Sequence, residues 1–248
     1  MSNVTLKGVY GDDLMIVNFA RASTGKEVNA LSEQDIKFIH YLAREIHIAP
    51  FFHPKLSFKI TAPLFIARQW DRHRIGVSRL DDFSDISELS RRYISTEPEY
   101  YHFEEWRRKP EKSIKQGSGE PFASKMLNDH LNGIYEYANH TAKRAYLELL
   151  DREVAPEQAR AVLPTATLTC WIETGSLHYW VRFCDLRSDS HAQKDIQSYA
   201  QVIAAHCEQH FPHAWPALRE HAPIALHHTV KKLKDRIIQL ENYINEHA

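Results

Sequence analysis

Arginines gather in two short segments of the chain, and their spacing suggests anion binding. The segment 67–74, ARQWDRHR, holds three arginines, a histidine and a glutamine directly after an apolar run. The segment 87–93, SELSRRY, follows a little downstream. Arginine binds phosphate through two parallel hydrogen bonds, and Ser90 with nearby backbone N–H groups could complete a phosphate cradle. The two segments therefore suggest a site for a nucleotide phosphate.

Two further side chains in these segments suit a heterocycle. Glu88 could accept a hydrogen bond from a base or a sugar. His73 lies between Arg72 and Arg74, whose like charges favour a neutral imidazole that can stack on a flat ring. A solvated strand end with surface ion pairs is the competing interpretation, and the two segments alone leave it open.

Short strands and long helices would position these residues. We expect strands at 5–10, 14–20, 56–61 and 166–173, bounded by polar turns and Pro-rich loops. Amphipathic or apolar spacing predicts helices at 31–47, 123–154, 155–164, 176–187 and 190–212. Pro63 interrupts the strand before it, so the segment from Leu64 could form a helix instead. Residues 75–94 and 95–122 are typical of loops, and the heptad-like tail 230–248 could pack on another subunit. The fold class is α+β, a mostly antiparallel sheet packed on long helices in a single domain over residues 1–248.

Composition narrows the function. Thirty-one basic residues against 32 acidic ones give a net charge of -1, which argues against a basic nucleic-acid coat. The 16 histidines show no metal-binding spacing, so we predict no metal site. Cys170, Cys184 and Cys207 fit a reduced protein, and no apolar run approaches the ~20 residues of a membrane span. We expect a cytoplasmic protein with no membrane partner.

The order of its motifs makes the chain similar to the flavin-dependent thymidylate synthases. That family's signature is RHR, a spacer and SxNExSxRY, and here RHR at 72–74 precedes ExSxRY at 88–93. HIAPFFH, KQGSGE and LRSDSHAQ resemble further family segments in the same order, so the resemblance covers almost the whole chain. It implies C5-methylation of a uridine monophosphate, dUMP to dTMP. It also implies FAD reduced by NADPH, 5,10-methylenetetrahydrofolate as carbon donor, and a homotetramer with sites between subunits.

The resemblance also implies a role for particular residues. The predicted catalytic residues are Arg187, which would hold and polarise the pyrimidine, and Ser90. The nucleotide site would comprise Gln69, Arg72, Glu88, Leu89, Ser90, Arg91, Arg92, Arg160 and Arg187. The flavin site would comprise Ser23, His47, His73, Arg74 and His191. An ion-paired helix arginine is the competing interpretation for Arg187, and a helix-capping role is the one for His47.

Departures from the family pattern fall mainly on the flavin side and on the spacer. The spacer is about eight residues longer than usual, a length that costs little in loop entropy. Ser87 replaces an Asn and Phe52 replaces a Glu, while Ser176, His178 and Arg182 replace residues around the flavin. These changes bear on the flavin contacts and on the final product more than on the nucleotide class.

Three other functions are open. A divergent relative would act on UMP or would make a 5-hydroxymethyl nucleotide. The long spacer is the only sequence feature that suggests the hydroxymethyl product. A single-stranded nucleic-acid binder would use arginines interleaved with aromatics, as in YYHFEEWRRK, but the balanced charge disfavours it. A degenerate relative kept for assembly would not need Arg72, Glu88, Ser90, Arg92 and Arg187 in register.

Overall fold

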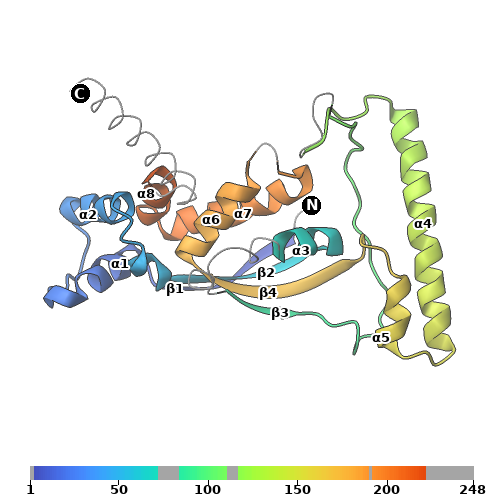
Figure 1. Cartoon of the computed structure of the whole chain (residues 1–248), viewed down its shortest axis with the longest axis horizontal. Coiled ribbons are helices and arrows are strands. Elements are labelled where there is room, and N and C mark those ends of the chain that lie inside the picture. Colours follow the sequence, from blue (N-terminus) through green and yellow to red (C-terminus); the bar gives the residue numbers. More distant parts are fainter. Residues whose placement is uncertain (1–2, 72–83, 111–116, 190–191, 222–248) are drawn as a thin grey trace, which may run out of the picture. The chain divides into compact units, whose positions relative to one another are not determined.

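The computed structural model of the chain describes residues 3–71, 84–110, 117–189 and 192–221 (Figure 1). The chain divides into two compact units. Unit 1 comprises residues 1–8, 57–174 and 187–202, and unit 2 comprises residues 9–56, 175–186 and 203–248. Among the described helices, none combines the length and the apolar character needed to cross a bilayer. A single family-type domain over residues 1–248 stays a prediction.

A four-stranded antiparallel sheet confirms the α+β fold class. Its strands, in the spatial order β1-β2-β4-β3, are β1 (Asn3–Tyr10), β2 (Lys55–Pro63), β4 (Leu168–Ser176) and β3 (Ser84–Glu88). In β2 the side chains of Leu56, Phe58 and Ile60 are buried in alternation, as predicted. The hydroxyls of Ser57 and Thr174 lie 2.7 Å apart and mark the register between β2 and β4.

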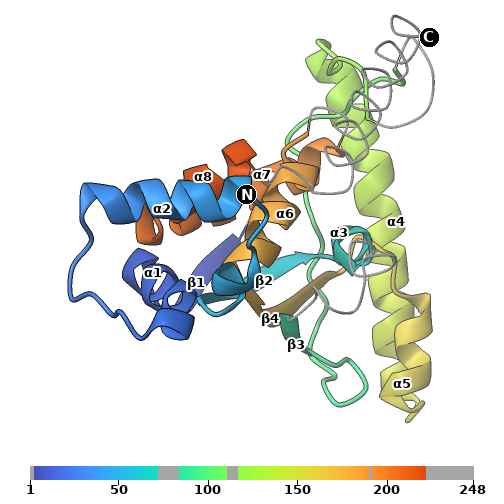
Figure 2. The same cartoon turned by 60° about the vertical axis from the view of Figure 1, so that its left-hand side comes forward.

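Unit 1 contains several helical elements and a buried aromatic cluster. Its helical elements are α3 (Leu64–Asp71), α4 (Lys125–Asp151), α5 (Pro156–Ala159), the 3-10 helix η3 (Arg160–Val162) and the first half of α7 (Lys194–His210). Trp70 on α3 is 1% exposed and meets the Trp171 ring edge-on at 5.2 Å and the Tyr199 ring at 6.2 Å. This cluster fixes the end of α3, which carries the first part of the arginine-rich segment 67–74. The long helix α4 lies beside α5 in both views (Figures 1 and 2).

Unit 2 contains the remaining helices. They are α1 (Asp13–Ala20), η1 (Ala22–Thr24), α2 (Glu33–Arg44), η2 (Ala49–Phe52), most of α6 (Leu177–Arg187), the second half of α7 and α8 (Ala214–His221). Helix α2 begins with a capping box, in which Ser32 and Asp35 each accept a hydrogen bond from the other's backbone N–H. Figure 2 shows α2 alongside α8, and Trp180 is fully buried with its Nε1 donating to the Leu56 carbonyl.

The strand predicted at 14–20 was wrong, because these residues form helix α1. The side chain of Asp12 accepts a hydrogen bond from Met15 N at 2.8 Å and caps the helix, whereas the strands expected at 5–10 and 14–20 placed Asp12 in a polar turn between them. The fourth strand is instead β3, within the segment 75–94 that we expected to be a loop. Its sequence, SDISE, lacks the apolar alternation of a half-buried strand, which is compatible with its place at the edge of the sheet.

The other elements agree with the sequence. The helices predicted at 31–47, 123–154, 155–164, 176–187 and 190–212 are confirmed as α2, α4, α5 with η3, α6 and α7. Leu64 does begin a helix. The heptad-like tail at 230–248 lies outside the described residues, and α8 was not predicted.

Candidate functional site

Helix α3 and the end of α6 bring two of the predicted nucleotide-site residues together in unit 1. Nη2 of Arg187, the last residue of α6, donates a hydrogen bond to the Gln69 carbonyl oxygen. Both side chains are half-buried. The side-chain oxygen Oε1 of Gln69 is buried and accepts no hydrogen bond from the described part of the chain. The pair thus combines a guanidinium held by the backbone with a buried acceptor that a ligand can satisfy.

The second arginine-rich segment begins at the end of β3. Glu88 accepts a 2.7 Å hydrogen bond from the Thr169 hydroxyl on β4, and Leu89 N donates to the Cys170 carbonyl. The chain then turns at Ser90, whose hydroxyl oxygen accepts from Arg92 N at 3.3 Å. Strand β4 therefore orients Glu88, and the turn presents the Ser90 side chain beside two arginines.

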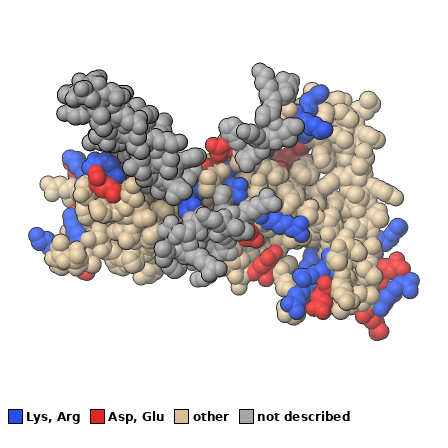
Figure 3. All heavy atoms as spheres, in the orientation of Figure 1, with Lys and Arg blue, Asp and Glu red and all other residues tan. Residues whose placement is uncertain are grey.

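Arginines 92 and 160 meet at one acidic residue. Nη2 of Arg92 lies 3.5 Å from Oε2 of Glu157, and Nε of Arg160 donates to the Glu157 carbonyl oxygen at 3.4 Å. The Arg92 and Glu157 side chains are each more than half exposed, so solvent screens their ion pair. Figure 3 shows acidic and basic side chains intermixed over α5 and the adjoining end of α4. Arg91 is held differently, by a bond from Nη1 to the Thr96 carbonyl.

The described flavin-site predictions lie in unit 2. Ser23 is exposed in η1. His47 N donates to the Leu42 carbonyl at 2.8 Å after Ile46 adopts a left-handed conformation (φ 62°), so its backbone caps α2. The His47 imidazole remains exposed, 6.2 Å from the Tyr41 ring. Capping by the backbone and ligand binding by the side chain are therefore compatible.

Two of the departures from the family pattern contact each other in unit 2. The rings of Phe52 and His178 pack edge to face at 5.1 Å, and His178 is 8% exposed. Ser176 is fully buried, and its hydroxyl accepts a hydrogen bond from Tyr179 N at the start of α6. Phe52 therefore packs against another altered residue, and Ser176 serves the local fold of α6.

Several predicted site residues lie outside the described residues: Arg72, His73, Arg74 and His191. Sequence reasoning missed two residues. Thr169 holds Glu88. Glu157 pairs with Arg92 through its carboxylate and accepts a hydrogen bond from Arg160 through its backbone carbonyl. Because the contact with Arg160 is to the backbone and the carboxylate pairs with the distant Arg92, side-chain spacing gave no signal for Glu157. The pairing of Thr169 with Glu88 depends on strand register and has no local signal.

Burial makes two of the cysteines poor nucleophiles. Cys184 and Cys207 are fully buried, and burial raises the pKa of both thiols. They remain protonated near neutral pH, and a thiol reacts as the thiolate.

Comparisons with known proteins converge. Residues 6–213 match the sequence model of the thymidylate synthase complementing proteins. A flavin-dependent thymidylate synthase of Thermus thermophilus is 34% identical over 88% of this chain and 76% of its own length. That of Thermosipho africanus is 36% identical over 80% of this chain and 82% of its own. Crystal structures of the UMP/dUMP methylase PolB from Streptomyces cacaoi cover 89% of this chain and 95% of PolB. The PolB structure bound to 5-Br dUMP superimposes on this chain with a TM-score of 0.75 at 26% sequence identity. The one bound to 5-Br UMP does so with a TM-score of 0.76 at 25% identity.

Proposed function

Because the chain belongs to the flavin-dependent thymidylate synthase family, we propose that it methylates C5 of dUMP to give dTMP. Family membership makes it a flavin-dependent enzyme of methyltransferase type. The observation that carries the proposal is the contact between Arg187 and Gln69, where a guanidinium held by the backbone lies beside a buried acceptor oxygen that has no hydrogen-bond donor among the described residues.

The Arg187–Gln69 pair suits a uracil ring. The Arg187 guanidinium would donate to a uracil carbonyl oxygen, which would hold and polarise the ring with C5 placed to attack the carbon donor. The buried Oε1 of Gln69 would accept the N3–H proton of uracil in a hydrogen bond, which removes the cost of an unsatisfied acceptor. Both interactions orient the ring relative to the carbon donor.

The exposed arginines suit the nucleotide phosphate. Arg92 and Arg160 already converge on Glu157, and an exposed ion pair of this kind contributes only ~0–1 kcal/mol. A phosphate that binds both guanidiniums through charge-assisted hydrogen bonds replaces that pair at little cost. Ser90, at the turn after β3, would donate its hydroxyl proton to a phosphate or sugar oxygen.

The cofactors are part of the proposal. Ser23 and His47 expose a hydroxyl and an imidazole, groups that fit FAD as hydrogen-bonding partners, and His73, Arg74 and His191 complete the proposed set. FAD, reduced by NADPH, would supply the hydride that completes the methyl group, and 5,10-methylenetetrahydrofolate would supply the carbon. The protonated state of the Cys184 and Cys207 thiols agrees with a route that uses no cysteine nucleophile.

A homotetramer with active sites between subunits is also proposed. The helix α4 supports it, because Met126, Ile134 and Tyr137 on this helix are 82%, 57% and 77% exposed. Large apolar side chains in such number on one long helix are typical of an interface with a second chain.

UMP is a second candidate substrate. The structural neighbour PolB is described as a UMP/dUMP methylase and was crystallised with analogues of both nucleotides. A 5-hydroxymethyl product stays a prediction, because the long spacer on which it depends lies mostly outside the described residues.

An anaerobic tritium-release assay tests the proposal. The protein, with FAD, NADPH and methylenetetrahydrofolate, receives 5-tritiated dUMP or UMP in separate reactions. We expect release from dUMP, and at least about tenfold less from Arg187→Lys, which loses the planar donor fork. Arg152→Lys, at an exposed pair with Glu148, is the matched control and should retain full release. Release from UMP alone would favour the second candidate, and no release from flavin-loaded protein would refute both.

A further inference from the structure

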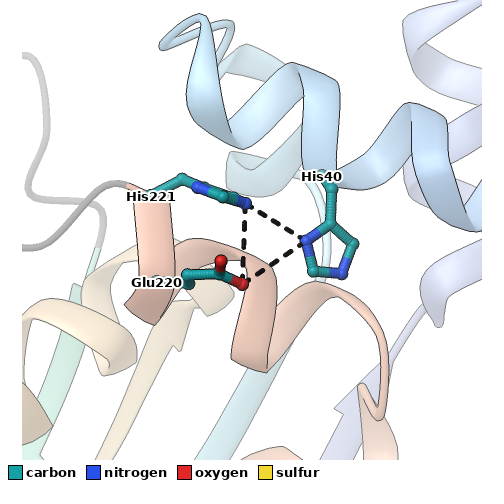
Figure 4. A group of neighbouring side chains, drawn as sticks. All are labelled: His40, Glu220 and His221. Carbon is teal, nitrogen blue, oxygen red and sulfur yellow. Dashed lines mark hydrogen bonds and ion pairs between the residues drawn. The ribbon is translucent and has the colours of Figure 1, made fainter.

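Two packed helices of unit 2 bring histidines from opposite ends of the described chain together. The buried faces of α2 and α8 include Ile39, Leu42 and Leu218, and these helices lie against each other. His40 and His221 lie at the rim of this contact, with side chains 35% and 21% exposed. Figure 4 shows both imidazoles pointing toward each other, with the Glu220 carboxylate beside them.

Both helices are fixed independently of these three residues. Helix α2 starts at the capping box of Ser32 and Asp35. Helix α8 starts where the two carboxylate oxygens of Asp13 accept hydrogen bonds from His213 N at 2.8 Å and Ala214 N at 3.0 Å. The imidazoles are therefore held near each other by the fold, so a ligand that joins them need not order the helices first.

The spacing of the three side chains matches a metal centre. Nδ1 of His40 lies 3.3 Å from Nε2 of His221 and 3.8 Å from Oε2 of Glu220. Nε2 of His221 lies 3.6 Å from the same carboxylate oxygen. For a triangle with these sides, the nearest point equidistant from the three atoms lies about 2.1 Å from each, which is the length of a zinc–imidazole or zinc–carboxylate bond.

We propose that His40, Glu220 and His221 form a binding site for a divalent transition-metal ion, for which Zn²⁺ is the probe. Two imidazole nitrogens and one carboxylate oxygen suit Zn²⁺, Co²⁺ and Ni²⁺, whereas Mg²⁺ and Ca²⁺ prefer oxygen ligands alone. Three protein ligands leave a position for water. The site lies wholly within unit 2 and does not depend on the proposed nucleotide chemistry.

The same geometry without metal is a plain hydrogen bond between the two imidazoles. One ring N–H then donates to the other ring across 3.3 Å, and Glu220 lies beyond hydrogen-bond distance of both rings. Both ring nitrogens that would face the metal must be unprotonated, so the metal displaces this hydrogen bond. The two states are distinguishable because only the metal requires all three side chains.

A zinc titration of the untagged full chain tests the proposal. Free zinc is followed by competition with a chromophoric chelator, and Co²⁺ replaces zinc in a second titration followed by visible absorption. We expect one equivalent per chain, and a visible cobalt band typical of fewer than six ligands. His40→Ala and His221→Ala should each weaken zinc binding at least ~100-fold, since removing even an outer partner of a ligand costs about 10–100-fold. Glu220→Gln should weaken it less, because an amide oxygen can still contact the metal.

His130→Ala is the matched control, because His130 is an exposed histidine on α4 in unit 1. It should bind zinc as the unaltered chain does. Circular dichroism and the metal-free unfolding temperature establish that each variant folds, and Glu220→Gln alters a largely exposed side chain, so it keeps the test available if a histidine variant does not fold. Unchanged affinity in His40→Ala or His221→Ala, or the absence of saturable binding, would overturn the proposal.

Discussion

Gly175, near the end of β4, is required for close packing in unit 2. A methyl group built on its Cα would lie 2.3 Å from Cδ1 of Tyr179 and 3.1 Å from Cε2 of Trp180. Tyr179 and Trp180 are buried, and their rings pack edge to face at 4.9 Å. Because both rings are buried and the methyl group would come too close to them, Gly175→Ala forces a shift of the backbone or of the rings.

The magnitude follows from these contacts. Inserting a methyl group into a well-packed core costs about 1–3 kcal/mol. Moving the Trp180 ring also weakens its 3.0 Å hydrogen bond to the Leu56 carbonyl, which contributes about 0.5–1.5 kcal/mol. We expect Gly175→Ala to lower the free energy of unfolding by about 2–3 kcal/mol. At about 2–4 °C per kcal/mol for a chain of this size, the unfolding temperature should fall by about 4–12 °C.

Calorimetry and urea unfolding measure the effect, with Gly133→Ala as the matched control. Gly133 lies within α4, and a methyl group there would meet nothing within 4 Å. Because alanine is about 1 kcal/mol more favourable than glycine within a helix, this variant should be more stable than the unaltered chain. Equal or higher stability of Gly175→Ala, or a fall of the same size in both variants, would refute the packing argument.

Three further predictions concern single carboxylates and a buried phenol. Asp13→Ala removes the two carboxylate oxygens that accept hydrogen bonds at the start of α8. It should lower the free energy of unfolding, measured by urea unfolding, by about 1–2 kcal/mol. The Ser32 hydroxyl lowers the pKa of Asp35, so the charged carboxylate stabilises the fold above its unfolded pKa of about 3.9 and loses this effect as pH falls through the lower folded value. Asp35→Asn should therefore lower the unfolding temperature at about pH 7 and have little effect below about pH 2, and equal effects at both pH values would contradict this. Burial raises the pKa of Tyr199 to about 12. In an ultraviolet titration of the tyrosines, Tyr199→Phe should therefore remove one ionisation that appears only at strongly alkaline pH.

The errors in the fold have identifiable local causes. Short apolar runs such as LMIVNFA fit a buried strand or one face of a helix equally well, and the Asp12 cap decides between them. The strand β3 has a polar sequence and lies at the edge of the sheet beside β4, so apolar alternation gave no signal for it. By contrast, the alternation in β2 and the Ser32 cap of α2 are local signals, and both gave correct elements.

The candidate site shows the same division between local and distant signals. Motif order placed Gln69 and Arg187 in one predicted site, and their contact joins residues 118 positions apart. The part of Thr169 in holding Glu88 depends on the pairing of β3 with β4, which no spacing in the sequence reveals. The histidines of α2 and α8 were likewise not recognised as neighbours, because metal-ligand spacing in a sequence detects only ligands that lie close along the chain.

The product of an anaerobic turnover tests the central claim most directly. The flavin-loaded protein, with NADPH and methylenetetrahydrofolate, is incubated with unlabelled dUMP, and the nucleotide is identified by mass spectrometry and chromatography against authentic dTMP. The account predicts conversion of dUMP to dTMP, with a mass gain of one CH₂ unit and dependence on both FAD and the folate. Unchanged dUMP from folded, flavin-loaded protein would contradict it.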